Sequence, residues 1–280
     1  MEKIAFSFGF IKVYWYSIFI FIAILAAYFI ISKEAKKKGI DKEFITNLTF
    51  YVVVFGIIGA RIYYCLFNLD YYLSNPLEIL KIWNGGLAIH GGILFGGIFT
   101  ILYIKKHHLE LLKTLDIIVV GVILAQAIGR WGNFFNSEAY GGITTLKALQ
   151  NMHLPTFIIN GMYISGKYRQ PTFLYESLWD LIGFIILLIF RRREYTKVGQ
   201  ITGLYFMWYS VGRFIIESMR SDSLMLGTVK IAQIVSILLF VLGILLFIYY
   251  KIIKKESRFE HLYKNDKKEE KEKQPLFIKQ

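Results

Sequence analysis

The chain has 280 residues, of which 55% are hydrophobic and 17% are aromatic. That composition excludes an ordinary soluble domain and is typical of a polytopic membrane protein. The formal net charge of +13 does not indicate a nucleic-acid partner. The basic residues form short clusters between apolar runs, as expected for loops that meet a lipid bilayer.

Seven apolar runs approach the length of about 20 residues that a helix needs to cross the hydrocarbon core. Several runs contain Gly, Arg, Glu or Gln, which indicates helices that face one another around a polar interior. We therefore predict an all-α polytopic membrane protein with seven transmembrane helices in a catalytic domain of residues 1–250. The helices are expected near residues 13–32, 47–67, 86–104, 114–135, 172–190, 199–218 and 231–250.

The Lys and Arg residues between the runs predict the orientation. The segments 33–46, 105–113, 191–198 and 251–280 carry 22 of them, and the alternate segments carry 8. By the positive-inside rule the N-terminus lies outside and the C-terminus in the cytoplasm, where 251–280 forms a charged tail. The external segment 136–171 contains several turn residues, which predict a small extracytoplasmic cap with a hairpin between Phe157 and Tyr168.

Polar residues gather at the outer end of the fourth run, in the stretch from Gly129 to Gly142. This stretch contains Arg130, two asparagines and a glutamate. Ionisable groups are costly in hydrocarbon, so they indicate a functional site. Arg213 and Glu217 lie late in the sixth run, four residues apart, and Arg220 follows three residues later, so all three share one helix face.

Three further runs bring polar groups to the same outer level. Tyr175 and Glu176 open the fifth run, Arg61 lies in the outer half of the second, and His90 begins the third between two Gly-Gly pairs that permit close backbone approach. Arg61 and His90 fit a structural role as well as a functional one, whereas Glu176 better fits hydrogen bonding between helices. The single Cys65 fits a small core residue better than a nucleophile.

Paired arginines facing a membrane cavity indicate phosphate as the group they bind. Arginine is permanently charged and presents a fork of donors that matches phosphate. No His, Asp or Glu cluster has the spacing of metal ligands, so no metal is expected. The residues alone therefore indicate an enzyme or a transporter for an anionic lipid, and a transporter or flippase stays the main alternative. A structural or receptor-like protein would not need ionisable groups in several spans.

The stretch from Gly129 to Gly141 closely resembles the signature of the bacterial phosphatidylglycerol–prolipoprotein diacylglyceryl transferase family. Three other segments resemble that family in the same order. Gly85 to Gly92 resembles its histidine segment, Gln170 to Glu176 its Pro-x-x-x-Tyr-Glu segment, and Gly212 to Glu217 its late arginine segment. The resemblance covers roughly residues 10–250.

The resemblance implies a seven-span enzyme of the bacterial cytoplasmic membrane. Its substrates would be phosphatidylglycerol and the signal peptide of a prolipoprotein, whose lipobox cysteine receives the diacylglyceryl group while glycerol phosphate is released. We expect no cofactor. The catalytic residues would be His90, Arg130, Arg213 and Glu217. The substrate-binding residues would be Tyr16, Arg61, Arg130, Asn133, Asn136, Glu138, Gly141, Tyr175 and Glu176.

Within that assignment, Arg130 and Arg213 would hold the headgroup, because guanidinium groups stabilise the charge that develops on a phosphate leaving group. A thiol needs a base or a positive field to become a thiolate at neutral pH. His90 would be that base, and Glu217 or a water molecule is the alternative.

Two positions are left open by the resemblance. The family's early tyrosine corresponds to Tyr14 or Tyr16. Gly142 departs from the family, which often has arginine after the motif glycine, so a headgroup contact there would have to come from another residue such as Arg169.

Overall fold

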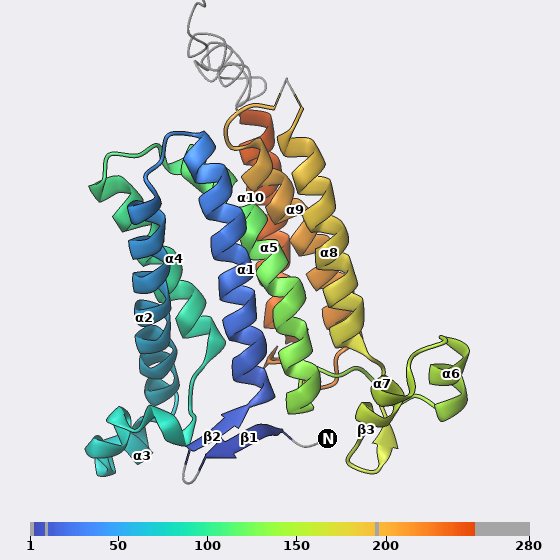
Figure 1. Ribbon diagram of the computed structural model, residues 1–280. Coiled ribbons are helices and arrows are strands. Elements are labelled where there is room, and N and C mark those ends of the chain that lie inside the picture. The colour runs from blue at the N-terminus through green and yellow to red at the C-terminus, as the bar shows by residue number, and fades with distance from the viewer. Residues whose placement is uncertain (1–2, 9–10, 194–195, 250–280) are drawn as a thin grey trace, which may run out of the picture. The chain divides into compact units, whose positions relative to one another are not determined.

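The computed structural model describes residues 3–8, 11–193 and 196–249. This part of the chain is mostly helical (Figure 1). Its long helices each have 18 or more residues. The predicted tail, 251–280, lies outside the described residues. The long helices are α1 (Trp15–Lys37), α2 (Lys42–Leu66), α4 (Ile89–Lys106), α5 (Leu111–Asn136), α8 (Thr172–Arg191), α9 (Gln200–Met219) and α10 (Ile231–Ile248).

Five of these helices, α1, α2, α5, α8 and α10, are long and apolar enough to cross a membrane. The chain is therefore a polytopic membrane protein. Helices α4 and α9 have a comparable length and contain charged residues or histidine, namely His90, Lys105 and Lys106 in α4 and Arg213 and Glu217 in α9. Every long helix overlaps one of the predicted runs.

Short elements connect the long helices. They include the helices α3 (Leu69–Ser74), α6 (Leu146–Asn151) and α7 (Thr156–Gly161), and 3-10 helices at Pro76–Leu80 and Ile82–Asn84. Three antiparallel hairpins pair β1 (Ile4–Phe8) with β2 (Ile11–Tyr14), β3 (Tyr163–Ile164) with β4 (Lys167–Tyr168), and β5 (Met225–Leu226) with β6 (Val229–Lys230). The all-α expectation thus holds for the long elements, while the connections add a few strands.

The predicted hairpin between Phe157 and Tyr168 is correct only for its second half. Residues 163–168 form β3 and β4, whereas Phe157 lies in α7. Pro155 stands directly before α7, where its fixed φ and missing N–H are compatible with the start of a helix.

Two compact units make up the chain, residues 1–31 with 115–280 and residues 32–114. In the second unit, α2 and α4 pack through glycines. A Cβ at Gly91 would collide with the backbone of Gly59, and a Cβ at Gly59 would lie 2.7 Å from the carbonyl oxygen of Gly91. The glycines that follow His90 therefore serve close packing of helices, as small residues commonly do in membranes.

In the first unit, two tryptophans fix α8 against α9. The indole rings of Trp179 and Trp208 stack with centroids 4.4 Å apart, and each Nε1 donates a hydrogen bond of 3.0 Å to the other residue's carbonyl oxygen. A Cβ on Gly183 of α8 would collide with the ring of Trp208, and a Cβ on Gly212 of α9 would collide with the ring of Trp179. This reciprocal contact sets the register of the two helices.

Helix α5 is joined to both of these helices by buried polar contacts. The carboxylate of Asp116 accepts hydrogen bonds from the backbone N–H groups of Gly199 (2.6 Å) and Thr202 (2.8 Å), and so caps the first turn of α9. The hydroxyl of Ser177 on α8 donates to the carbonyl oxygen of Ala127 on α5 at 2.8 Å. The three helices are therefore held in a defined relation.

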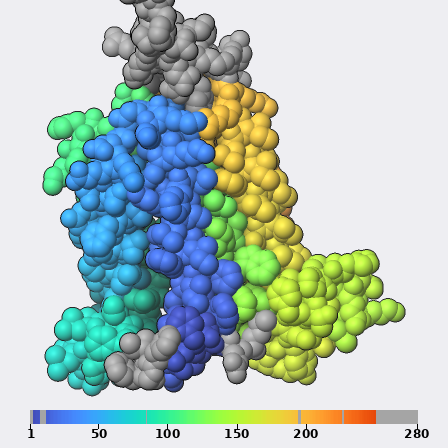
Figure 2. All heavy atoms as spheres, in the orientation of Figure 1, coloured from blue at the N-terminus to red at the C-terminus, as the bar shows by residue number. Residues whose placement is uncertain are grey.

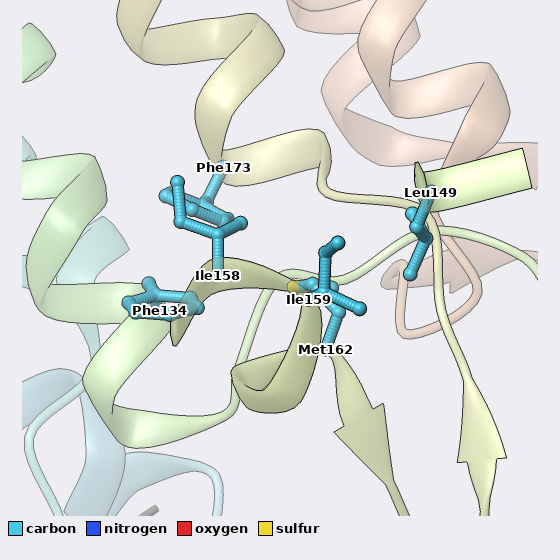
Figure 3. Close-up of a cluster of buried hydrophobic side chains, with 6 residues drawn as sticks. All are labelled: Phe134, Leu149, Ile158, Ile159, Met162 and Phe173. Atoms are coloured by element: carbon cyan, nitrogen blue, oxygen red, sulfur yellow. The ribbon is translucent and has the colours of Figure 1, made fainter. Parts of the chain in front are cut away.

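A small hydrophobic core lies where α5 ends and α8 begins. Phe134 of α5 stacks on Phe173 of α8 with centroids 4.5 Å apart. Around them pack buried side chains of α6, α7 and the residue that follows α7, namely Leu149, Ile158, Ile159 and Met162 (Figure 3). Residues 137–171 thereby form a small lobe beside the start of α8, seen in yellow-green in Figure 2.

Candidate active site

Helices α5, α8 and α9 each bring a charged side chain to one end of the first unit. Arg130 lies about two turns before the end of α5, Glu176 in the second turn of α8, and Arg213 about two turns before the end of α9. Since α8 begins where α5 and α9 end, the three residues meet at one level.

Glu176 stands between the two arginines. Its Oε1 lies 2.6 Å from Nη2 of Arg130 and 3.1 Å from Nη1 of Arg213, which is also 3.3 Å from Oε2. The Glu176 side chain is only 3% exposed. The expectation that Glu176 bonds neighbouring helices is therefore correct, and its partners are the two arginines singled out in the sequence.

The row of charges continues along α9. Nη2 of Arg213 lies 2.8 Å from Oε2 of Glu217, and Nη1 of Arg220 lies 3.5 Å from the same oxygen. These contacts confirm the helix face predicted from the spacing of four and three. Beyond them, Nε of Arg220 donates to Oδ1 of Asp222 at 3.0 Å. Three arginines thus alternate with three carboxylates in one ion-pair row, which consists of Arg130, Glu176, Arg213, Glu217, Arg220 and Asp222.

Asp222 is a residue that the sequence did not single out. Its Oδ2 accepts a hydrogen bond of 2.9 Å from the backbone N–H of Ala139, while the hydroxyl of Thr172 donates to the carbonyl oxygen of Ala139. Ala139 has a φ of 55°, and Ser137 a φ of 56°. Non-glycine residues in this region are strained, so the two contacts hold the turn that carries Glu138.

The polar residues of the motif follow the last turns of α5. Nη1 of Arg130 lies 3.5 Å from Oδ1 of Asn133, and Nδ2 of Asn136 donates to Oε1 of Glu138 at 2.7 Å. The backbone N–H of Glu138 also donates to the carbonyl oxygen of Asn133 at 3.0 Å. The motif is therefore one connected polar surface, with the exposed Glu138 at its end.

Gly141 follows in an extended segment between two other pieces of backbone. Its N–H donates to the carbonyl oxygen of Gln170, and it forms a β-bridge with Arg220. A Cβ on Gly141 would lie 2.8 Å from Cβ of Gln170 and 3.0 Å from Cγ2 of Thr172. The absence of a side chain is what lets the motif pack closely against the segment that leads into α8.

We expect Gly141→Ala to reduce activity by about tenfold or more, because the new methyl group must push the motif away from its two neighbours. Gly142→Ala is the matched control, since a Cβ there meets nothing within 4 Å. Initial rates and thermal unfolding of both variants in detergent would check this. Equal activity of the two variants would contradict the close-packing role of Gly141.

The structure distinguishes between the two early tyrosines. Tyr16 packs on the motif, because a Cβ at Gly132 would lie 3.0 Å from its ring, and it interacts electrostatically with Arg130 and Glu138. Tyr14 is 43% exposed. Tyr16 is therefore the early tyrosine beside the motif.

Two other predicted residues contact the lobe of residues 137–171. The hydroxyl of Tyr175 lies 3.7 Å from the sulfur of Met152, and the guanidinium of Arg169 lies over the ring of Tyr140, 5.2 Å from its centroid. Arg169 is thus adjacent to the motif, whereas Tyr175 faces α6 and its loop.

Arg61 and His90 belong to the second unit. The buried Arg61 donates hydrogen bonds to four backbone carbonyls between α3 and α4, those of Glu78, Ile79, Gly85 and Gly86. Its donors hold this loop, which favours the structural alternative. His90 is exposed at the start of α4, with its ring centroid 6.1 Å from that of Tyr63.

Comparison with known proteins gives the family. Residues 3–249 match the protein family described as prolipoprotein diacylglyceryl transferase. The chain belongs to this family. Similar proteins named phosphatidylglycerol–prolipoprotein diacylglyceryl transferase occur in Staphylococcus carnosus, with 48% identity over 89% of this chain and 90% of the relative, and in Staphylococcus xylosus, with 45% identity over 93% of each. The protein of that name in Staphylococcus aureus strain MSSA476 is 47% identical over 90% of each chain.

The match to the prolipoprotein diacylglyceryl transferase family includes every element that builds the ion-pair row. Helices α5, α8 and α9 and the loop to Asp222 all lie inside residues 3–249. The row is therefore part of the family domain, and its geometry can be compared with the chemistry that the family name describes.

Proposed function

We propose that this protein transfers the diacylglyceryl group of phosphatidylglycerol to the lipobox cysteine of a prolipoprotein signal peptide. The product is a thioether, and glycerol phosphate is released. The observation that carries this proposal is the bridge of Arg130 and Arg213 by Glu176, at one end of three helices, in a chain of this family.

The reaction forms one bond and breaks another. The substrate sulfur attacks the terminal glyceryl carbon, and the bond from that carbon to the phosphate oxygen breaks. The bond's electron pair stays on the departing glycerol phosphate, and the thiol proton passes to a base. Two guanidinium groups beside the phosphate stabilise this developing charge with bidentate, charge-assisted hydrogen bonds.

The other proposed roles follow from the contacts. Asn133, Asn136 and Glu138 line the motif surface next to Arg130, and Gly141 lets that surface pack against Gln170 and Thr172. Glu217 orients Arg213. We keep His90 as the proposed base because imidazole is the side chain that most often serves as a general base, with Glu217 as the alternative. Headgroup binding by Arg61 and Tyr175 stays a prediction.

The enzyme's own cysteine is not the nucleophile in this scheme. Cys65 is buried in α2, a long apolar helix. A cysteine nucleophile must be accessible to its substrate, and buried structural cysteines are inert. The reacting thiol therefore comes from the substrate.

The proposal includes seven spans in the cytoplasmic membrane, with the N-terminus outside. The seven long helices and the excess of Lys and Arg in alternate segments support it. In a Cys65→Ala background, a membrane-impermeant thiol reagent applied from outside should label Lys147→Cys and not Lys106→Cys. Labelling of Lys106→Cys alone would reverse the topology.

The activity is tested with the purified protein, phosphatidylglycerol and a lipobox peptide. Mass spectrometry should show the peptide gaining the diacylglyceryl mass, with one glycerol phosphate released per thioether. Lipid movement between leaflets without a thioether would instead support a lipid transporter. The same assay between pH 6 and 9 tests the base, since His90→Gln should lower the rate and change its pH dependence.

A further inference from the structure

The ion-pair row is electrically balanced before any substrate arrives. Its three arginines carry three positive charges and its three carboxylates carry three negative ones, and the carboxylates of Glu176 and Glu217 are only 3% and 2% exposed. A phosphodiester headgroup would bring a further negative charge into this balanced set. Like charges held close together in a poorly solvated site repel one another strongly.

Glu176 also uses the donors that a phosphate would need. One carboxylate oxygen lies within 3.1 Å of both guanidinium groups, on Nη2 of Arg130 and Nη1 of Arg213. A carboxylate and the two free oxygens of a phosphodiester present the same pair of acceptors to an arginine fork. They therefore cannot both occupy the space between the two arginines with these contacts.

We propose that Glu176 is an internal counter-anion, which the phosphate of phosphatidylglycerol displaces from Arg130 and Arg213 and which returns when glycerol phosphate leaves. This inference rests on the proposed function. It changes the role predicted for Glu176, which competes with the headgroup for the arginines and does not bind it.

Other contacts also hold together the helices that Glu176 joins. The Trp179–Trp208 pair sets the register of α8 on α9, and Ser177 joins α8 to α5 independently. A competing carboxylate has a use in turnover, because the product keeps the phosphate group and would otherwise stay bound to the same two arginines. An internal anion lowers the affinity for substrate and product alike and so favours release.

The test measures binding of glycerol phosphate to the purified full-length protein by calorimetry, without lipid substrate or peptide. Glu176→Gln removes the negative charge with little change in shape, and we expect it to bind glycerol phosphate about tenfold more tightly than the wild type. Asp116→Asn is the matched control. Asp116 is a buried carboxylate of α5 whose hydrogen bonds come from the backbone of Gly199 and Thr202 and not from the two arginines, so the affinity of this variant for glycerol phosphate should change by about twofold at most.

In the turnover assay, Glu176→Gln should show a lower KM for phosphatidylglycerol and stronger inhibition by glycerol phosphate, with a lower kcat. Unchanged or weaker binding of glycerol phosphate by Glu176→Gln, or no binding by either protein, would overturn the proposal, because a residue that contacts the headgroup or merely orients the arginines would lose affinity. If Glu176→Gln does not fold, Glu176→Asp keeps the charge but is too short to bridge both arginines, and it should bind about threefold more tightly than the wild type.

The two proposals fail in different ways. A wild type that forms no thioether would refute the transferase function, while tighter anion binding by Glu176→Gln would still support the displacement. A wild type that forms the thioether, combined with a Glu176→Gln variant of unchanged anion affinity, would refute the displacement alone.

Discussion

Arg213→Lys is expected to lower kcat/KM by about 100-fold or more while the protein remains folded. Arg213 is the centre of the ion-pair row, since its guanidinium contacts both Glu176 and Glu217. Lysine keeps the charge but has no planar fork, so it cannot bind Glu217 and a phosphate at the same time. Steady-state kinetics with phosphatidylglycerol and a lipobox peptide, together with thermal unfolding, would measure both effects.

Arg213→Ala should be worse, because it leaves two buried carboxylates with fewer cations and is expected to lower the free energy of unfolding by about 3 kcal/mol. Arg193→Ala is a suitable control. Arg193 lies at the opposite end of α8, where its guanidinium lies over the ring of Phe190, and its removal should leave turnover near that of the wild type. Near-normal activity of Arg213→Lys would contradict the phosphate-binding role.

Arg130→Lys is expected to lower kcat/KM by a similar factor, about 100-fold, through loss of the second guanidinium on the phosphate. The cost in stability should be smaller than for Arg213, because Glu176 keeps Arg213 as a partner and, among the residues that the structure describes, Arg130 is ion-paired with Glu176 alone. Unfolding in denaturant and the same kinetic assay would separate the two quantities.

The double variant Arg130→Lys with Arg213→Lys tests whether the two arginines act on the same phosphate. Because both arginines share Glu176 and the same phosphate, the loss in the double variant should be smaller than the product of the two single losses. Independent, multiplicative losses would show that the two arginines act on different groups, and the two-arginine site would then be wrong.

The long helices were predicted well from the sequence, which also singled out Arg130 and Arg213, the two arginines that meet at Glu176. Apolar runs of about 20 residues are a strong signal, because a helix must satisfy its backbone within the bilayer. The spacing of Arg213, Glu217 and Arg220 sufficed to predict their common face, since helical neighbours are fixed by local geometry. Arg130 could be singled out because a charged side chain in an apolar run is costly unless it has a function.

Contacts between distant segments could not be predicted in this way. Asp222 binds the backbone of Ala139 across 83 residues, and no periodicity encodes such a pair. The sequence also left Tyr14 and Tyr16 undecided, because the choice depends on how α1 packs against Gly132. The helix α7 was missed since six residues with Pro before them fit a turn as well as a helix.

Glu176 shows where sequence reasoning stops. Its position in the second turn of α8 indicated a helix contact, but only the structure shows one carboxylate between two arginines. The pairing of those charges decides whether the site is open to an anion or must exchange one anion for another. That distinction concerns mechanism and cannot be taken from the motif.

The most direct test of the two-arginine site is an experimental structure of the protein with phosphatidylglycerol bound. We expect the lipid phosphate to lie within hydrogen-bonding distance of both Arg130 and Arg213, and the carboxylate of Glu176 to have moved away from at least one of them. A lipid phosphate bound elsewhere, with the Arg130–Glu176–Arg213 bridge intact, would contradict the two-arginine site.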